Sequence, residues 1–246
     1  MENNLHLIEH QEMVMKVRLP KGSGPHPVLL LLHGWTGDEN VMWIFASRLP
    51  PNYLMIAPRG LYQSPLGGYG WHEHRRTQWP AVEEFKPAVE ALAGLVAHEN
   101  GASPDLVKVL EDLPGSKEVI SKVDFSEISL VGFSQGAALS YAFALNHPHR
   151  VHLMAGLAGF LPENVEGMVE KKPLEGKHVF VTHGAQDDIV PVEKARRAVE
   201  LLQRAGSEVT YCEEQAGHKL SASCFRALEA FFDKYAYKSG SLSSAE

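Results

Sequence analysis

The chain has 246 residues, of which 44% are hydrophobic and 22% charged, and its formal net charge at pH 7 is −7. These values are ordinary for one globular domain. The negative charge and the lack of a concentrated basic run argue against a nucleic-acid partner and against stable membrane association. The longest apolar run, residues 28–32, is far too short to span a bilayer.

Cysteine usage and the N-terminus indicate the cellular setting. Cys212 and Cys224 are the only cysteines. They are too few, and their spacing matches no motif, to predict a disulfide framework or a zinc site. The first residues carry an acid and amides and have no apolar core typical of a signal peptide. We therefore expect a reducing, cytoplasmic location.

The first elements in chain order are β-strands. Residues 5–8 and 13–19 are predicted as two short strands joined through residues 9–12, and Pro20 ends the second. Residues 28–32 are continuously apolar, which is typical of a strand buried on both faces of a parallel sheet. Similar runs recur at 53–57, 128–131, 151–158 and 178–182.

Segments with helical spacing lie between these strands, at 38–49, 82–99, 134–146, 192–205 and 222–235. Strands that alternate with helices predict right-handed crossovers and a mainly parallel sheet with helices on both faces. The first two strands would form an antiparallel N-terminal edge. We expect a single α/β domain over residues 1–237, followed by a flexible polar tail at 238–246.

Residues 101–123 form an insert that is longer than a simple helix-to-strand connection needs. Ser103 and Pro104 predict a helix start, and apolar residues then recur at helical spacing from Leu106 to Leu113. This amphipathic helix has three interpretations: a small lid, a contact in a homodimer, or a helix packed on the body of the domain.

The sharpest motif is Gly-Phe-Ser-Gln-Gly at 132–136, directly after an apolar strand and directly before a helical segment. A strand-to-helix turn with flanking glycines is the context of a nucleophile elbow, which raises a serine hydroxyl above the sheet. The motif alone occurs by chance, but this context removes most coincidences. It predicts Ser134 as the nucleophile.

The catalytic partners are expected in the order serine, acid, histidine. The strand at 178–182 runs into a loop that offers Asp187 and Asp188, and a later strand candidate, 208–212, leads to His218. In this arrangement His218 accepts the proton of Ser134 and returns it to the leaving alcohol, and the aspartate orients the imidazole. The spacing leaves the choice between the two aspartates open.

An oxyanion hole needs two backbone donors. The N–H of Gln135, the residue after the nucleophile, is one candidate, and the N–H of Trp35, after the first buried strand, is the other. An ordinary glycine turn capped by Asp38 would give the same sequence at 33–38. This chemistry requires no metal and no organic cofactor.

The remaining histidines are interpreted as surface or structural residues. This applies to His33, His147, His149 and His183, for which the sequence offers no nucleophile to activate. His72 and His74 are too few ligands to predict a metal site.

Several motifs together resemble the phospholipase/carboxylesterase family, which includes acyl-protein thioesterases and bacterial carboxylesterases. The motifs are Leu-His-Gly at 32–34, Ala-Pro-Arg-Gly at 57–60, Gly-Tyr-Gly-Trp-His at 68–72, the serine motif with Ala137, His-Gly-x-x-Asp-x-x-Val-Pro at 183–191, and Gly-His at 217–218. The resemblance covers roughly residues 26–235 and implies an α/β-hydrolase fold. It also implies that Asp187 is the triad acid and that Trp71 lines the substrate pocket.

We therefore expect a carboxylesterase that acts on a small-molecule ester with a short- to medium-chain acyl group. The chain departs from many relatives at Trp35, a bulky side chain that could narrow the pocket, and in its long insert. A thioesterase or lysophospholipase with the same triad is the nearer alternative. A non-catalytic ligand-binding protein on the same scaffold is the more distant one.

Overall fold

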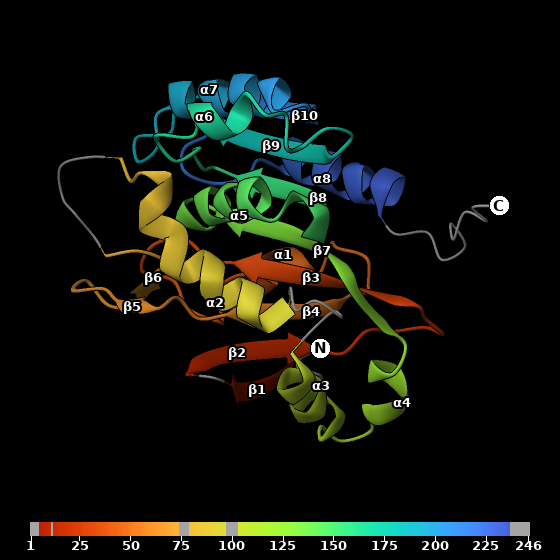
Figure 1. Cartoon of the computed structure of the whole chain (residues 1–246). Helices are drawn as coiled ribbons and strands as arrows, with labels where there is room; N and C mark the ends of the chain where they lie inside the picture. Colours follow the sequence, from red (N-terminus) through yellow and green to blue (C-terminus); the bar gives the residue numbers. More distant parts are fainter. Residues whose placement is uncertain (1–4, 11, 74–78, 97–102, 237–246) are drawn as a thin grey trace.

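The computed structural model describes residues 5–10, 12–73, 79–96 and 103–236. Within these ranges an eight-stranded sheet forms the centre of the molecule, and Figure 1 shows it from β1 at the bottom to β10 at the top. In spatial order the strands are β1 (Leu5–His10), β2 (Met13–Arg18), β4 (Leu54–Pro58), β3 (His26–Leu32), β7 (Val123–Phe133), β8 (Val151–Leu157), β9 (His178–Gly184) and β10 (Glu208–Glu214).

The pairing confirms the mainly parallel sheet with an antiparallel N-terminal edge. Strand β2 runs antiparallel to both β1 and β4, and all other neighbours from β4 to β10 are parallel. Every residue of β3 and β4 is buried, as the continuous apolar runs predicted. Because β3, β7, β9 and β10 run in the same direction, the loops after them gather at one edge of the sheet.

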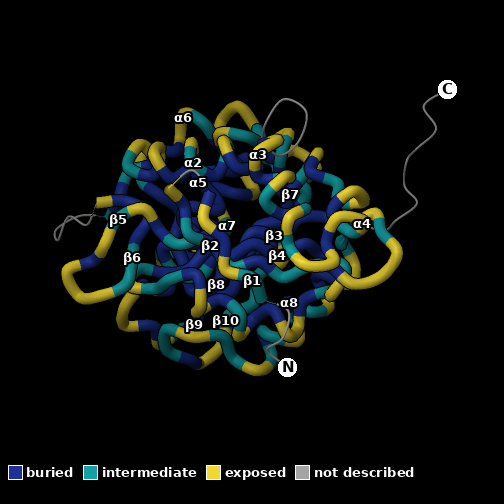
Figure 2. Tube along the Cα trace, turned by 90° about the horizontal axis from the view of Figure 1, so that it is seen from below, coloured by how far each residue is buried: buried dark blue, intermediate teal, exposed yellow. Residues whose placement is uncertain are grey.

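Helices cover both faces. Apolar side chains of α2 (Lys86–Val96), α5 (Gln135–Asn146) and α7 (Val192–Arg204) share one core cluster, and those of α1 (Trp43–Ala46) and α8 (Ala222–Tyr235) share the other. Shorter pieces are the β5–β6 hairpin (Tyr62–Gln63 and Tyr69–Gly70), η1 (Val82–Phe85), η2 (Pro148–Arg150) and α6 (Glu166–Val169). Figure 2 shows the buried strands and α5 enclosed by exposed loops.

The helix predicted at 38–49 is reduced to the single turn of α1. The carboxylate of Asp38 accepts a hydrogen bond from the Asn40 N–H, which favours a local turn over a helix. The carbonyl oxygen of Glu39 accepts from the indole Nε1 of Trp43 at 2.8 Å. In a helix this carbonyl would accept from the backbone N–H of Trp43 instead. The side chains of the segment therefore override its apolar periodicity.

The insert forms α3 (Pro104–Glu111) and α4 (Lys117–Ile120). Leu106 and Leu110 of α3 are fully buried, and the helix lies against β1 at the edge of the sheet (Figure 1). This placement matches a helix packed on the body of the domain. Residues 101–102 and the predicted tail at 238–246 lie outside the described residues.

A disulfide bond joins Cys212 of β10 to Cys224 in the first turn of α8. The expectation that the two cysteines form no disulfide is therefore wrong. They are 12 residues apart, and they meet because the chain reverses between β10 and α8, which brings their Cα atoms to 5.7 Å.

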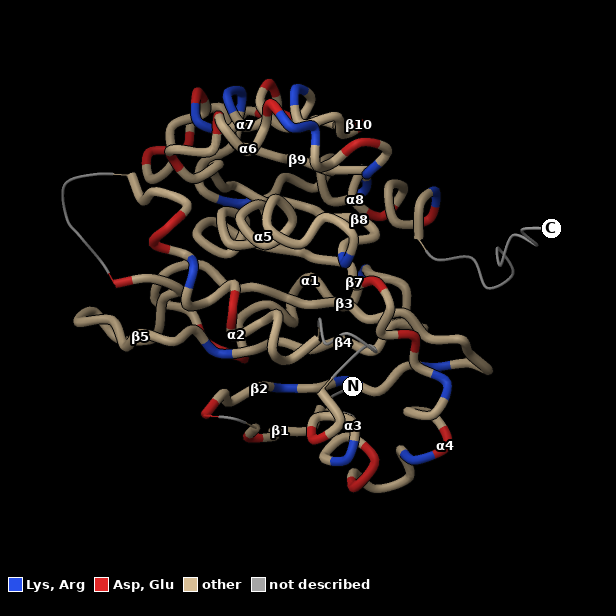
Figure 3. Tube along the Cα trace, viewed as in Figure 1, with Lys and Arg blue, Asp and Glu red and all other residues tan. Residues whose placement is uncertain are grey.

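Charged side chains lie mainly at the periphery of the fold. In Figure 3 they alternate in sign along α7, at the top, whereas the central strands carry few. Lys194, Arg196, Arg197 and Arg204 of this helix each pair with a glutamate of another segment. Within the described ranges, no helix has both the length and the apolar character needed to cross a membrane.

Candidate active site

Ser134 occupies the turn between the end of β7 and the start of α5. Its backbone adopts φ 54° and ψ −116°, a combination that residues with a side chain rarely adopt. Its N–H donates to the carbonyl oxygen of Leu157 at 2.8 Å, which ties the turn to the end of β8. Such strain costs on the order of 1–3 kcal/mol and is concentrated at functional sites. The backbone is therefore strained at the residue that the sequence predicts as the nucleophile.

The two glycines of the motif are needed for packing. A Cβ at Gly132 would lie 2.2 Å from the carbonyl oxygen of Gly136, and a Cβ at Gly136 would lie 2.0 Å from that of Leu32. Both clashes are with backbone atoms, so no side-chain movement could relieve them. The glycines therefore allow α5 to start directly against β7 and β3, which fixes the direction of the serine.

Asp187, which is buried, and His218, which is partly exposed, form a hydrogen-bonded pair. The Nδ1–H of His218 donates to Oδ2 of Asp187 at 2.7 Å. The backbone N–H groups of Ile189 and Val190 each donate to Oδ1 at 2.9 Å, so both oxygens of this carboxylate are engaged. The neighbouring Asp188 is exposed. Of the two aspartates, the structure brings Asp187 to His218.

A second histidine contacts the same carboxylate. His183 lies at the end of β9 with its side chain fully buried, and its Nε2 lies 3.2 Å from Oδ2 of Asp187. The same nitrogen donates to the carbonyl oxygen of Val190 at 2.7 Å. Burial lowers the pKa of His183 and so favours the neutral ring. This residue, interpreted from the sequence as structural, supports the loop that carries the acid.

His218 lies next to the serine turn. Its ring packs against that of Phe133, the residue before Ser134, with a centroid distance of 5.0 Å. The end of β9 fixes the other side of the histidine loop, since a Cβ at Gly184 would lie 2.3 Å from the carbonyl oxygen of Gly217. The side chain of Ser221 caps α8 three residues further on. His218 therefore meets Asp187 beside Phe133, the residue that precedes Ser134.

The loop at 33–37 packs directly on the serine. A Cβ at Gly34 would lie 3.2 Å from Cβ of Ser134. His33 anchors the loop: its Nδ1–H donates to the carbonyl oxygen of Gly34, and its Nε2 accepts from the N–H of Gly60. Burial lowers the pKa of His33, which keeps the ring neutral as this pattern requires. Trp35, the expected oxyanion donor, is two residues further on.

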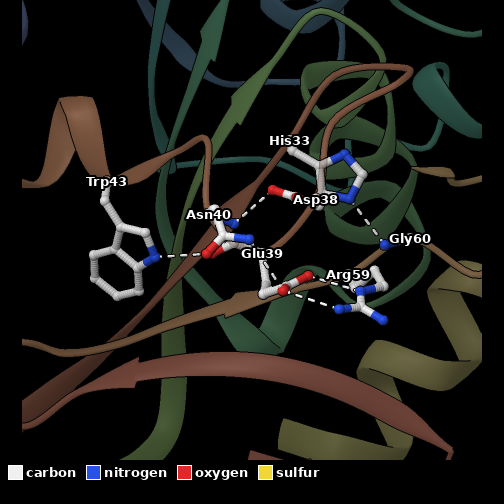
Figure 4. Close-up of polar contacts among 7 residues, drawn as sticks. All are labelled: His33, Asp38, Glu39, Asn40, Trp43, Arg59 and Gly60. Carbon is white, nitrogen blue, oxygen red and sulfur yellow. Dashed lines mark hydrogen bonds and ion pairs between the residues drawn. The ribbon is translucent and has the colours of Figure 1, made fainter. Parts of the chain in front are cut away.

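An ion pair holds the segment that follows this loop (Figure 4). Arg59, directly after β4, donates from Nε and Nη2 to the two carboxylate oxygens of Glu39, at 2.7 and 2.9 Å. Glu39 is only 4% exposed. The guanidinium keeps the pKa of Glu39 below its ordinary value and in turn raises that of Arg59. The bidentate geometry connects the chain after the 33–37 loop to the end of the neighbouring strand.

Trp71 contacts both the 33–37 loop and the start of α5. Its side chain is fully buried, its indole Nε1 donates to the carbonyl oxygen of His33 at 2.7 Å, and its ring lies 4.8 Å from the imidazole of His33. Its backbone N–H donates to the side-chain Oε1 of Gln135 at 2.8 Å. Trp71 therefore connects the 33–37 loop to the start of α5. It is not among the residues that line the cavity beside His218.

A cavity of about 490 Å³ opens beside His218. It is lined by residues 34–37 and 218–220, by Phe133, by Phe225 of α8, and by Val41, Met42, Ile44 and Phe45 around α1. Apart from His218 and Lys219 these lining residues are uncharged, and most are apolar. The expectation that Trp35 contributes to the pocket wall agrees with this lining.

Sequence reasoning missed the residues that support the site. The functions of His33, His183, Glu39 and Arg59 become visible only in the fold. A weak signal existed, because His33, His183 and Arg59 each stand at or directly after the end of a buried strand, where functional loops start. Among the described residues, no group of three or more His, Cys, Asp or Glu side chains is arranged to hold a metal ion.

Comparison with known proteins places this geometry in context. The sequence model of a family described as Phospholipase/Carboxylesterase matches residues 15–236. Acyl-protein thioesterase 1 of Kluyveromyces lactis is 26% identical over 192 residues, which cover 72% of this chain and 76% of that protein. A probable carboxylesterase of Oryza sativa subsp. japonica is 30% identical over 188 residues, covering 66% and 68%.

The fold is also similar to solved structures. The crystal structure of the Bacillus cereus carboxylesterase superimposes with a TM-score of 0.72 at 22% identity, over 92% of this chain and 95% of that one. At this identity the likeness concerns the fold. It agrees with the α/β-hydrolase architecture expected from the sequence.

Proposed function

Because this chain belongs to the phospholipase/carboxylesterase family, we propose that it is a serine carboxylesterase that hydrolyses short- to medium-chain carboxylic esters through an acyl-enzyme on Ser134. The observation that carries the proposal is the 2.7 Å hydrogen bond between Asp187 and His218. The ring of His218 packs beside the strained turn that contains Ser134. A small-molecule ester is the proposed substrate.

The hydrogen-bond pattern supports the following route for the protons. Since Nδ1 of His218 donates to Asp187, the lone pair of the neutral ring is on Nε2. This nitrogen takes the proton of Ser134 as Oγ attacks the ester carbonyl. It then delivers that proton to the leaving alcohol as the carbon–oxygen bond breaks. In the second half of the reaction water attacks the acyl-enzyme and gives a proton to Nε2 of His218. Nε2 then returns this proton to Oγ of Ser134 as the acid is released.

The backbone N–H groups of Gln135 and Trp35 are proposed as the oxyanion donors. Gln135 is the first residue of α5, and the first N–H groups of a helix have no acceptor within the helix. Trp35 belongs to the loop that His33 holds against Ser134. Loss of one such donor typically costs about 100- to 1,000-fold in kcat.

Labelling with a serine-directed fluorophosphonate tests the nucleophile. We expect the wild-type protein to be labelled at one residue, with an adduct on the peptide that contains Ser134 in mass spectrometry. Ser134→Ala should abolish labelling. Ser129→Ala, which removes the hydroxyl of a different serine within β7, should leave labelling unchanged. An unlabelled wild-type protein would contradict the whole catalytic proposal and favour a binding protein on this scaffold.

An acyl-thioesterase is the second candidate, favoured by the similarity to the Kluyveromyces lactis protein that bears this name. The triad serves both reactions. A panel of p-nitrophenyl esters of increasing chain length, with acyl-thioesters and a lysophospholipid, separates the candidates. We expect the highest kcat/KM on short to medium oxygen esters. A preference for long-chain thioesters would replace the first candidate by the second.

We further propose a cytoplasmic location. Disulfide bonds are rare in that compartment, so the Cys212–Cys224 bond opposes this proposal and provides its test. Alkylation of free thiols in freshly lysed source cells, followed by mass spectrometry, should find both cysteines alkylated. A fully oxidised pair would place the protein in an oxidising compartment instead.

A further inference from the structure

We infer that the cavity beside His218 receives the alcohol part of the ester and selects for bulky apolar alcohols. This inference rests on the proposed function, because it takes Ser134 as the nucleophile and His218 as the acid that protonates the leaving group. It adds a substrate class: esters in which a small acyl group is joined to a ring-containing primary alcohol.

The position of the cavity indicates which part of the ester it receives. His218 and the two residues after it form part of its wall, together with Phe225 of α8. The loop at 158–161 lies against the serine turn on the face of the sheet that α5 covers, opposite the cavity. A Cβ at Gly159 would lie 2.9 Å from the carbonyl oxygen of Ser134 and 2.3 Å from Cβ of Ala137. That loop supplies none of the residues that line the cavity, so the cavity lies on the histidine side of Ser134.

The geometry of ester cleavage determines the direction in which each part of the ester extends. The carbonyl carbon is attacked by Ser134 while its oxygen points to the oxyanion donors, so two substituents remain to be placed. The leaving oxygen has to lie within hydrogen-bonding reach of the histidine that protonates it. The group attached to that oxygen therefore extends on the histidine side. The acyl chain extends on the other side, away from the cavity.

The chemistry of the walls indicates the kind of group that the cavity receives. The ring of Phe45 stacks against those of Phe133 and Phe225, with centroid distances of 6.1 and 5.8 Å. Ile44 is 70% exposed and Val41 44% exposed, although both are apolar and both line the cavity. Aromatic walls and an apolar mouth favour a ring-shaped apolar occupant, and a volume of about 490 Å³ is enough for a bicyclic group.

A pair of isomeric esters tests the inference directly. 2-Naphthylmethyl acetate carries the ring on the alcohol, and methyl 2-naphthylacetate carries the same ring on the acyl group. We expect kcat/KM to be about tenfold or more higher for the acetate, because only its ring enters the cavity. Cyclohexylmethyl acetate and methyl cyclohexylacetate form a second pair, which should show the same order without an aromatic ring.

Matched variants connect the preference to the cavity. Ile44→Asp places a charge at the mouth and should reduce kcat/KM for 2-naphthylmethyl acetate by about fivefold or more, with a smaller loss for methyl 2-naphthylacetate. Ile44 is exposed, so folding is not at risk. Leu66→Asp is the control: Leu66 is 73% exposed but does not line the cavity, and both rates should stay at the wild-type value.

The outcomes separate this inference from the proposed function. A wild-type protein that prefers methyl 2-naphthylacetate, or an Ile44→Asp variant that loses mainly that activity, would assign the cavity to the acyl group and overturn the inference. The esterase proposal would stand in that case. Failure to hydrolyse any of the four esters, together with absent phosphonate labelling, would contradict the proposed function itself.

Discussion

Asp187 and Asp188 are adjacent and chemically identical, yet their surroundings differ completely. Asp187 accepts hydrogen bonds from two backbone N–H groups and from His218, whereas Asp188 is exposed. We predict that Asp187→Asn lowers kcat by about 10,000-fold, because the amide favours the wrong imidazole tautomer. Asp188→Asn should leave kcat within about twofold of the wild type.

Steady-state kinetics on p-nitrophenyl butyrate, with circular dichroism to verify folding, checks this prediction. A larger loss in Asp188→Asn than in Asp187→Asn would move the acid by one residue along the chain. Similar losses in both variants would indicate that the loop, and not one carboxylate, orients His218.

At the scale of elements, the segment after the 33–37 loop depends on the ion pair between Glu39 and Arg59. Arg59→Met leaves a nearly buried carboxylate without its bidentate partner. We predict that the free energy of unfolding falls by about 2 kcal/mol. We also predict that kcat falls more than KM rises, because the oxyanion loop loses its anchor. Urea denaturation and kinetics measure the two effects.

Arg196→Met is the matched control for this variant. Arg196 also forms a bidentate pair, with Glu213, but it is exposed and lies on α7. Its loss should affect stability less and kcat not at all. Equal effects of the two substitutions on kcat would contradict the anchoring role. The double variant Glu39→Gln/Arg59→Met should recover part of the stability, since no buried charge is left unpaired.

The connection between β10 and α8 carries His218 inside the ring closed by the Cys212–Cys224 bond. Cross-linking a loop of this length limits the unfolded chain and contributes about 3 kcal/mol. We predict that the double variant Cys212→Ser/Cys224→Ser unfolds at a lower temperature and has a lower kcat, because the histidine loop becomes less well defined. Calorimetry and kinetics at 25 °C check the two parts.

Dithiothreitol should reproduce these effects in the wild type and have none in the double variant. An unchanged kcat in the double variant would show that the packing of His218 on Phe133 and the cap at Ser221 fix the loop without the bond.

For the whole molecule, buried histidines predict a stability that depends on pH. Burial lowers the pKa of both His33 and His183 in the folded state. The unfolded chain therefore binds more protons than the folded protein once the pH falls below about 6.5. The stabilisation by neutral rings is complete above that pH and is lost as the pH falls. We predict that the free energy of unfolding decreases between pH 7.5 and pH 5.5.

Urea denaturation at intervals of half a pH unit measures this dependence. His183→Gln keeps a side-chain donor but does not titrate, so its curve should be flatter than that of the wild type. A wild-type stability that is constant or rises over this range would contradict the assignment of both rings as neutral in the folded state.

The sequence by itself determined the class of fold and two of the residues proposed for catalysis, Ser134 and His218. Continuous apolar runs indicate strands that are buried on both faces of the sheet. The order strand, glycine, serine, glycine, helix indicates a tight turn, because the helix can start so close to the strand only where glycines stand. These signals are local along the chain, so they can be interpreted without a structure. The same local rule failed at 38–49, where the Asp38 turn and the Trp43 indole compete for the backbone.

The tertiary structure decided what depends on distance in space. It brought Asp187, and not Asp188, to His218, joined two cysteines expected to be unpaired, and buried Trp71 against His33. It also formed the cavity from α1, α8 and two loops far apart in the chain. Periodicity determines which face of an element is buried, but partners across the sheet are set by the packing of whole elements, and no local pattern encodes them.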